Sequence, residues 1–138
     1  MLNFLAAAQR HLDDGDLLHR HARAASTVQF WAYGAECVLK AISLSQGHFA
    51  LNSTGIPTNG FGLHLNQTGK NGSDLLSLYN AAQAGTSALM GPTSAFAGWE
   101  IAARYHDGTQ LQPLSRYFDD AQCFRNLLNS ALVHGILP

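Results

Sequence analysis

Two short stretches of the chain carry acidic, basic and aromatic residues at spacings that could support chemistry. Glu36 and Lys40 are four residues apart, in the order that favours an ion pair on one helix face. A second cluster supplies an indole, a guanidinium, a phenol and an imidazole: Trp99, Arg104, Tyr105 and His106. A guanidinium can stabilise developing negative charge, and carboxyl, phenol and imidazole groups can exchange protons. Together the two stretches could form an acid–base site, if the fold brings them close.

Glu36 lies at the edge of an apolar helical stripe, so we expect its carboxylate to be partly buried. A buried charge without a partner is costly, and the planar guanidinium of Arg104 could pair with it and hold two helices in register. A surface pair of Glu36 with Lys40, worth roughly a few tenths of a kcal/mol, is the alternative. Trp99 is expected in the core because its ring buries a large area, and five residues of helix rotate Arg104 onto a different face.

Familiar catalytic and metal-binding patterns are absent from the sequence. His19 and His21 are two residues apart, so on a helix their rings point about 200° apart, while His11 and His19 lie two turns apart. Neither spacing suits a shared zinc ion. There is no Walker loop, no C-x-x-C pair and no G-x-S-x-G turn. We therefore predict no metal, no cofactor and no standard catalytic residues.

The elements that must position these residues are predicted to be helices. Apolar residues recur every three or four positions over several segments, most clearly from residue 24 to residue 42, and no stretch alternates as a strand would. Gly15 interrupts the first segment, and Gly34 leaves room for a neighbouring backbone. The predicted helices are Asn3–Ala22, Ala24 to about residue 46, Ser73 or Asp74 to Ala84, Thr93 or Ser94 to Tyr105, and about Pro113 to His134. The pattern predicts an all-α fold, an up-and-down antiparallel bundle of four to five helices.

A loop or insertion rich in glycine and asparagine, near residues 47–73, interrupts the helical pattern. We expect Gly47 to end the helix before it and a short helix to begin near Leu63. Loops of this length inside a compact domain are uncommon and are often functional. The 138 residues otherwise suit a single domain, 1–138.

Composition limits the partners that the chain can have. Only 12% of the residues are charged, about half of the usual ~25%, and a surface so poor in charge favours burial in a homodimer. The net charge of −1 gives no general attraction to phosphate backbones, so nucleic-acid binding would need a local basic patch. No apolar run approaches the ~20 residues of a membrane span, and we expect a cytoplasmic protein. Cys37 and Cys123 are expected to be buried thiols, with a disulfide between them as the alternative.

Three motifs resemble those of the HEPN-like (higher eukaryotes and prokaryotes nucleotide-binding) family. Residues 33–41, YGAECVLKA, are similar to the "Y-A-x-E-C-x-L-K-A" signature of the family's second helix. Residues 10–14, RHLDD, resemble the first-helix "R-H-L-x-D-A", with Gly15 in place of the small alanine. Residues 99–105, WEIAARY, resemble "W-x-x-x-x-R-Y". The order and approximate spacing agree, and the three motifs span most of the chain.

The resemblance implies a prokaryotic bundle of about five helices that is often dimeric. Many members of the family are ribonucleases or toxins, and some pair with a small nucleotidyltransferase. Nuclease members carry R-x4–6-H on a late helix, but here no arginine precedes a histidine at that spacing, and eight residues separate Arg125 from His134.

We therefore expect a non-catalytic HEPN-like module that binds a partner protein, a nucleotide or a nucleic acid. On this interpretation Glu36, Lys40 and the WEIAARY residues form a structural or ligand-binding polar network rather than a catalytic one. The alternative is a HEPN-type ribonuclease or toxin component, or a nucleotidyltransferase partner. It would use four side chains for its chemistry: Glu36, Arg104, Tyr105 and His106.

Overall fold

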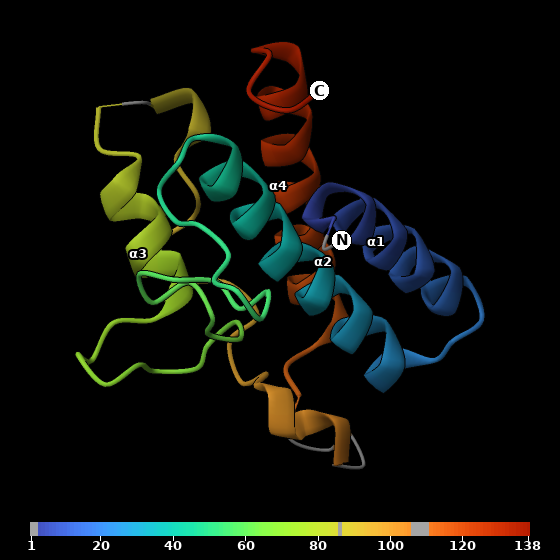
Figure 1. The fold of residues 1–138 in the computed structure, drawn as a ribbon. Coiled ribbons are helices and arrows are strands. Elements are labelled where there is room, and N and C mark those ends of the chain that lie inside the picture. The colour runs from blue at the N-terminus through green and yellow to red at the C-terminus, as the bar shows by residue number, and fades with distance from the viewer. Residues whose placement is uncertain (1–2, 86, 106–110) are drawn as a thin grey trace.

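A computed structural model describes residues 3–85, 87–105 and 111–138, and within these ranges the chain forms four α-helices and no β-strand (Figure 1). The helices are α1 (Phe4–Arg20), α2 (Ala24–Ser45), α3 (Leu75–Ala82) and α4 (Leu114–Val133). Two short 3-10 helices, η1 (Ser87–Leu89) and η2 (Ile101–Tyr105), lie between α3 and α4. The predicted all-α class is confirmed. None of the described helices is long and apolar enough to cross a membrane.

Local signals in the sequence explain where α1 and α3 begin and where α2 and α4 end. The side chain of Asp74 accepts the Ser77 N–H at 2.8 Å and caps α3, as predicted. The side chain of Asn3 caps α1 in the same way, by accepting the Ala6 N–H at 2.9 Å. Gly47 and Gly135 follow α2 and α4 with φ angles of 76° and 70°, which end a helix at little cost for glycine.

The predicted helix from Thr93 or Ser94 to Tyr105 is wrong over most of its length. Residues 90–100 are irregular, and only η2 is helical. Phe96 and Gly98 have positive φ angles of 53° and 85°, which no α-helix tolerates. Side chains of α4 bind this backbone instead, as Asp120 accepts the Phe96 N–H at 2.8 Å. The short helix expected near Leu63 is also absent, because residues 63–73 form turns.

α2 is the central helix, and α1, α3, α4 and η2 all contact it. α1 runs antiparallel beside it, and α4 passes behind it in the view of Figure 1. The predicted apolar stripe is fully buried from Val28 to Ile42, whereas Ala24, at the first turn, is exposed. Because α2 is buried on several sides, some of its polar residues are buried as well, and Glu36 is one of them.

Two glycines let α1 and α2 approach closely. A Cβ atom added to Gly15 would lie 2.7 Å from Trp31 Nε1, and one added to Gly34 would lie 2.7 Å from Leu12 Cγ. Both distances are too short for real carbon contacts. The close approach predicted at Gly34 is therefore confirmed, and α1 runs through Gly15 as one continuous helix.

An ionic and polar network joins α1, α2 and α4. Trp31 Nε1 donates a hydrogen bond of 2.9 Å to Asp16 Oδ1. The Arg125 guanidinium of α4 pairs with Asp16 and, at 3.3 Å, with Asp13. The largest ring in the centre of the fold is thus held by both of the outer helices, which fixes the frame that carries the polar residues of α2.

Candidate functional site

A buried ion pair lies on α2. Glu36 Oε1 accepts a hydrogen bond from Lys40 Nζ at 2.7 Å, and the two residues are only 8% and 6% exposed. The predicted i,i+4 pair is present, but the alternative of a surface pair is wrong. Removing one partner of a buried pair typically costs about 3–5 kcal/mol, far more than a surface pair contributes. Glu36 and Lys40 therefore belong to the interior of the fold.

The second carboxylate oxygen of Glu36 holds the Gly/Asn-rich loop against α2. The Leu65 N–H donates to Glu36 Oε2 at 3.2 Å, and His64 Nδ1 lies 3.4 Å from the same oxygen. The Leu65 side chain is fully buried, whereas 47% of the His64 side chain is exposed. The loop is thus an integral wall of this site, and one carboxylate serves both the helix and the loop.

The environment of Glu36 suppresses ionisation of the neighbouring thiol. Burial, and after it the charge of Glu36, raise the pKa of Cys37 to about 11, while Lys40 and Arg10 act in the opposite direction. Cys37 and Cys123 are free thiols, so the disulfide alternative is wrong, but both are half-buried rather than fully buried as predicted. At neutral pH Cys37 is a protonated thiol, which is a poor nucleophile.

We expect Cys37 to react slowly with iodoacetamide in the folded protein at pH 8. A thiol with a pKa of about 11 has roughly 100-fold less thiolate at that pH than one with the ordinary value of 9.0. Mass spectrometry of the Cys123→Ser variant isolates the Cys37 rate, which should rise about tenfold per pH unit from pH 8 to 10. A rate equal to that of the urea-unfolded variant at pH 8 would contradict a buried thiol.

His11 of α1 adds a second group whose charge is suppressed. Burial is the main cause that lowers its pKa and the charge of Arg10 adds to it, while Asp14 and Glu36 act in the opposite direction. Its ring lies 5.7 Å from that of Tyr33, and its Nδ1 is buried with no hydrogen-bond partner in the described part of the chain. The imidazole is therefore neutral at pH 7 and packs as an aromatic group.

Trp99 is buried, as predicted, and connects the segment before η2 to the rest of the site. Its ring meets the Tyr33 ring of α2 edge-on, with centroids 5.9 Å apart. The Asn66 amide of the loop donates to the carbonyl oxygens of Ala95, Phe96 and Trp99, at 3.1, 3.0 and 2.9 Å. Loop 47–73 is therefore bound both to α2 and to the segment that carries Trp99.

The other residues of the second predicted cluster are less completely described. The backbone of Arg104 belongs to η2, but its side chain lies outside the described residues, as does all of His106. Tyr105 is described and is 77% exposed. The pairing of Glu36 with Arg104 and a role for His106 therefore stay predictions.

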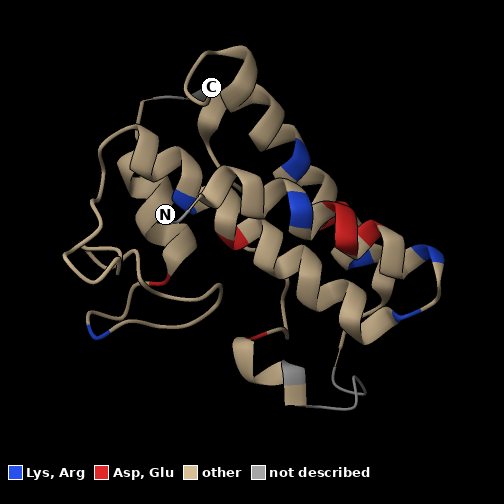
Figure 2. Cartoon of the chain, turned by 45° about the vertical axis from the view of Figure 1, so that its right-hand side comes forward, with Lys and Arg blue, Asp and Glu red and all other residues tan. Residues whose placement is uncertain are grey.

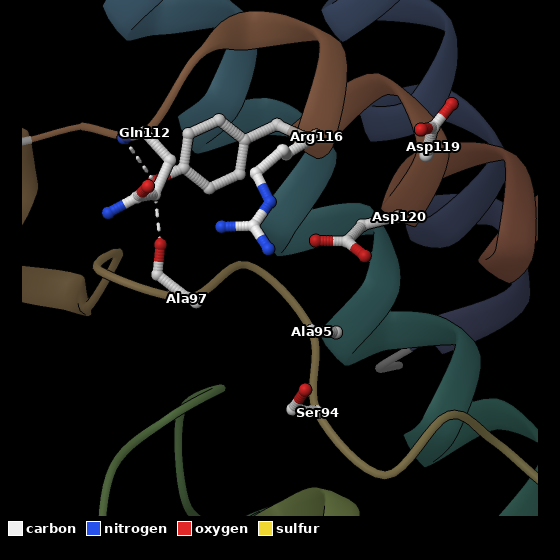
Figure 3. A pocket seen from close by; sticks show the side chains of 8 residues that line it. Ser94, Ala95, Ala97, Gln112, Arg116, Asp119 and Asp120 are labelled. Carbon is white, nitrogen blue, oxygen red and sulfur yellow. Dashed lines mark hydrogen bonds between the residues drawn. The ribbon is translucent and has the colours of Figure 1, made fainter.

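A polar pocket of about 220 Å³ lies between the start of α4 and the irregular segment 94–97 (Figure 3). The Arg116 guanidinium points into this pocket, near the Asp120 carboxylate (Figure 3). Burial raises the pKa of Asp120, while the Phe96 N–H and the Arg116 charge lower it. The Arg116 guanidinium forms no ion pair or hydrogen bond with the described residues, so its donors face the pocket.

The hydroxyl of Tyr117 fixes one end of this pocket. It donates to the Ala97 carbonyl at 2.7 Å and accepts the Gln112 N–H at 3.0 Å. A second pocket of about 290 Å³ adjoins the first, because Ser94, Ala95 and Ala97 line both. The segment that was predicted to be helical thus forms the shared wall of the two pockets.

Sequence reasoning missed the residues of the loop and of α4 that complete these sites. Arg116 and Asp120 are four residues apart on α4, and that spacing was a visible signal for a shared polar face. Nothing local marks Leu65 or Asn66 as partners of α2 and of segment 95–99, because their contacts join residues about 30 positions apart.

Comparisons with known proteins leave the family of the chain open. No family model, curated protein or solved structure matches it. The HEPN-like resemblance therefore rests on the three sequence motifs. In the described part of the chain, no three His, Cys, Asp or Glu side chains lie close enough together to hold a metal ion.

Proposed function

We propose that this chain is a non-catalytic HEPN-like helical module that acts as a homodimer and binds a partner protein, a nucleotide or a nucleic acid. The observation that carries the proposal is the state of Glu36, the acidic residue of the HEPN-like motif. Both of its carboxylate oxygens are engaged, one by the Lys40 ammonium and one by the Leu65 N–H. In this proposal α1, α2, α3, η2 and α4 correspond to the helices of the up-and-down antiparallel family bundle.

A general base must reach the proton that it removes, and its lone pair must be available. Glu36 does not meet the first condition, because it is 8% exposed, and each of its oxygens already accepts a hydrogen bond. Its arrangement instead supports a structural role, in which a satisfied polar network fixes the position of the loop on α2. This favours a binding module over the alternative in which Glu36 takes part in RNA cleavage.

The Arg116 pocket supports the binding part of the proposal. A guanidinium is well suited to phosphate and carboxylate groups, because its planar donors can form two parallel hydrogen bonds. Arg116 faces solvent through the pocket, whose lining also includes Ser94 of the irregular segment (Figure 3). A nucleotide phosphate, or an acidic side chain of a partner, would accept hydrogen bonds from this guanidinium.

The proposal predicts binding of anionic ligands without turnover. Titration of a fluorescent nucleotide and of a short labelled RNA should give saturable binding of at least one of them, and Arg116→Ala should weaken it about tenfold or more, the usual loss for a charge-assisted contact. Arg20→Ala, which removes an exposed guanidinium at the end of α1, is the matched control and should leave binding unchanged. Analytical ultracentrifugation should show a dimer.

The same protein samples test the ribonuclease alternative. We expect the labelled RNA to stay intact during long incubation, with or without added divalent cations. Robust cleavage that is lost in Arg104→Ala, with the fold preserved, would overturn the non-catalytic assignment. A monomer at all concentrations would overturn the homodimer assignment.

A further inference from the structure

A third cavity, of about 700 Å³, lies away from Glu36 and from the Arg116 pocket, between loop 47–73 and α3. Four apolar side chains line it: Ile56, Pro57, Leu63 and Leu78. Gly60, Gly62 and Gly69 form much of the remaining wall, so little side-chain volume fills the space. Its size falls within the range of small-molecule sites, which are typically about 300–1,000 Å³ and mostly apolar.

The charge of this cavity comes from one residue. Lys70 is the only charged residue that lines it, and it is also the only Lys, Arg, Asp or Glu in residues 47–73. Figure 2 shows that the charged residues gather mainly on α1, α4 and the turn between α1 and α2. The nearest acid along the chain, Asp74, caps α3 and does not line the cavity. Lys70 forms no ion pair in the described ranges.

We propose that this cavity binds a small amphipathic anion, namely a carboxylate or sulfonate with an aliphatic or aromatic body. The apolar body lies against Ile56, Leu63 and Leu78, and its burial supplies most of the affinity. The anionic group lies at Lys70, the one residue of complementary charge on the wall. The inference does not depend on the HEPN-like function, since the two sites share no residues.

Gly62 offers a way to close the cavity without straining the backbone. Its φ lies outside the left-handed region, and a Cβ added there would have Pro57 O at 3.6 Å and Ile56 Cγ2 at 3.9 Å as its nearest neighbours. Both are ordinary contacts, so Gly62→Ala fits and leaves most of the cavity open. Gly62→Leu would place a branched side chain at the wall and occupy the space of the ligand's apolar body.

The test uses 8-anilinonaphthalene-1-sulfonate as the probe and decanoate as its competitor, with the full chain. We expect saturable fluorescence enhancement with one site per chain and displacement by decanoate. Lys70→Gln should weaken binding about fivefold, less than the usual loss for a charge-assisted contact, because Lys70 is exposed and its charge is screened by solvent. Gly62→Leu should abolish saturable binding, while Gly62→Ala and the exposed-charge control Arg20→Gln should retain it.

Thermal unfolding of each variant shows that it is folded, so that probe binding to a partly unfolded chain is recognised. Absence of saturable binding by both anions, or unchanged binding in a folded Gly62→Leu variant, would overturn the site. Binding that Gly62→Leu removes but Lys70→Gln does not would overturn the assignment of an anion and would point to a neutral apolar group, such as a side chain of a partner protein. None of these outcomes depends on the Arg116 assay, so the two proposals can fail separately.

Discussion

Glu36→Ala is expected to lower the free energy of unfolding by about 3–5 kcal/mol. The substitution leaves the Lys40 ammonium, which is 6% exposed, without its partner at 2.7 Å. It also removes the acceptor of the Leu65 N–H, so loop 47–73 loses its direct contact with the carboxylate. Urea unfolding followed by circular dichroism at pH 7 measures the change.

The double variant Glu36→Met, Lys40→Met is the control for this interpretation. It removes both buried charges and retains similar side-chain volume, and apolar replacement of a buried pair is often neutral or stabilising. Only the Leu65 N–H is then left without an acceptor, at a cost of about 1–3 kcal/mol. The double variant should therefore be more stable than Glu36→Ala. Equal stability of the two variants would show that the unpaired lysine is not the source of the loss.

Gly15→Ala and Gly34→Ala are each expected to destabilise the fold by about 1–3 kcal/mol through overpacking. Alanine is a better helix former than glycine by about 1 kcal/mol, so helix propensity alone predicts the opposite sign. Steric overlap determines the sign of the stability change. The new Cβ atoms would lie 2.7 Å from Trp31 Nε1 in Gly15→Ala and 2.7 Å from Leu12 Cγ in Gly34→Ala. To make room, α1 and α2 must move apart along their shared contact.

Gly62→Ala is the matched glycine-to-alanine control, because its Cβ would meet only ordinary contacts. Its free energy of unfolding should stay within about 0.5 kcal/mol of the parent value. The same urea titrations report all three variants. If Gly15→Ala stabilised the protein, the helices would have to lie farther apart than the structure places them.

Helical periodicity predicted α1, α2 and α4 well, because each of these helices has an apolar side that the core buries. The caps were also readable, since Asp74 and Gly47 act locally. Residues 94–100 were misread because their small and aromatic residues look helical in isolation. Asp120 and Tyr117, both on α4, bind the backbone of Phe96 and Ala97 and override that preference.

The candidate site was predictable to a similar extent. The four-residue spacing gave the Glu36–Lys40 pair, and the core position of Trp99 followed from its size and spacing. Partial burial of the Glu36 carboxylate was expected, but its loop partner was not, because Leu65, in the irregular loop, supplies a donor from 29 positions away. Helical periodicity does not predict the contacts of an irregular loop, so only the folded structure reveals how loop 47–73 contacts α2.

The amide of Asn66 has a consequence for how ligands would influence one another. It bonds to three carbonyl oxygens of residues 95–99, so opening either the loop or that segment would break the same hydrogen bonds. A molecule that orders one of the two segments therefore reduces the conformational entropy that is lost when a second molecule orders the other. Occupants of the Lys70 cavity and of the Arg116 pocket would then strengthen each other's binding by the same factor, as thermodynamic reciprocity requires.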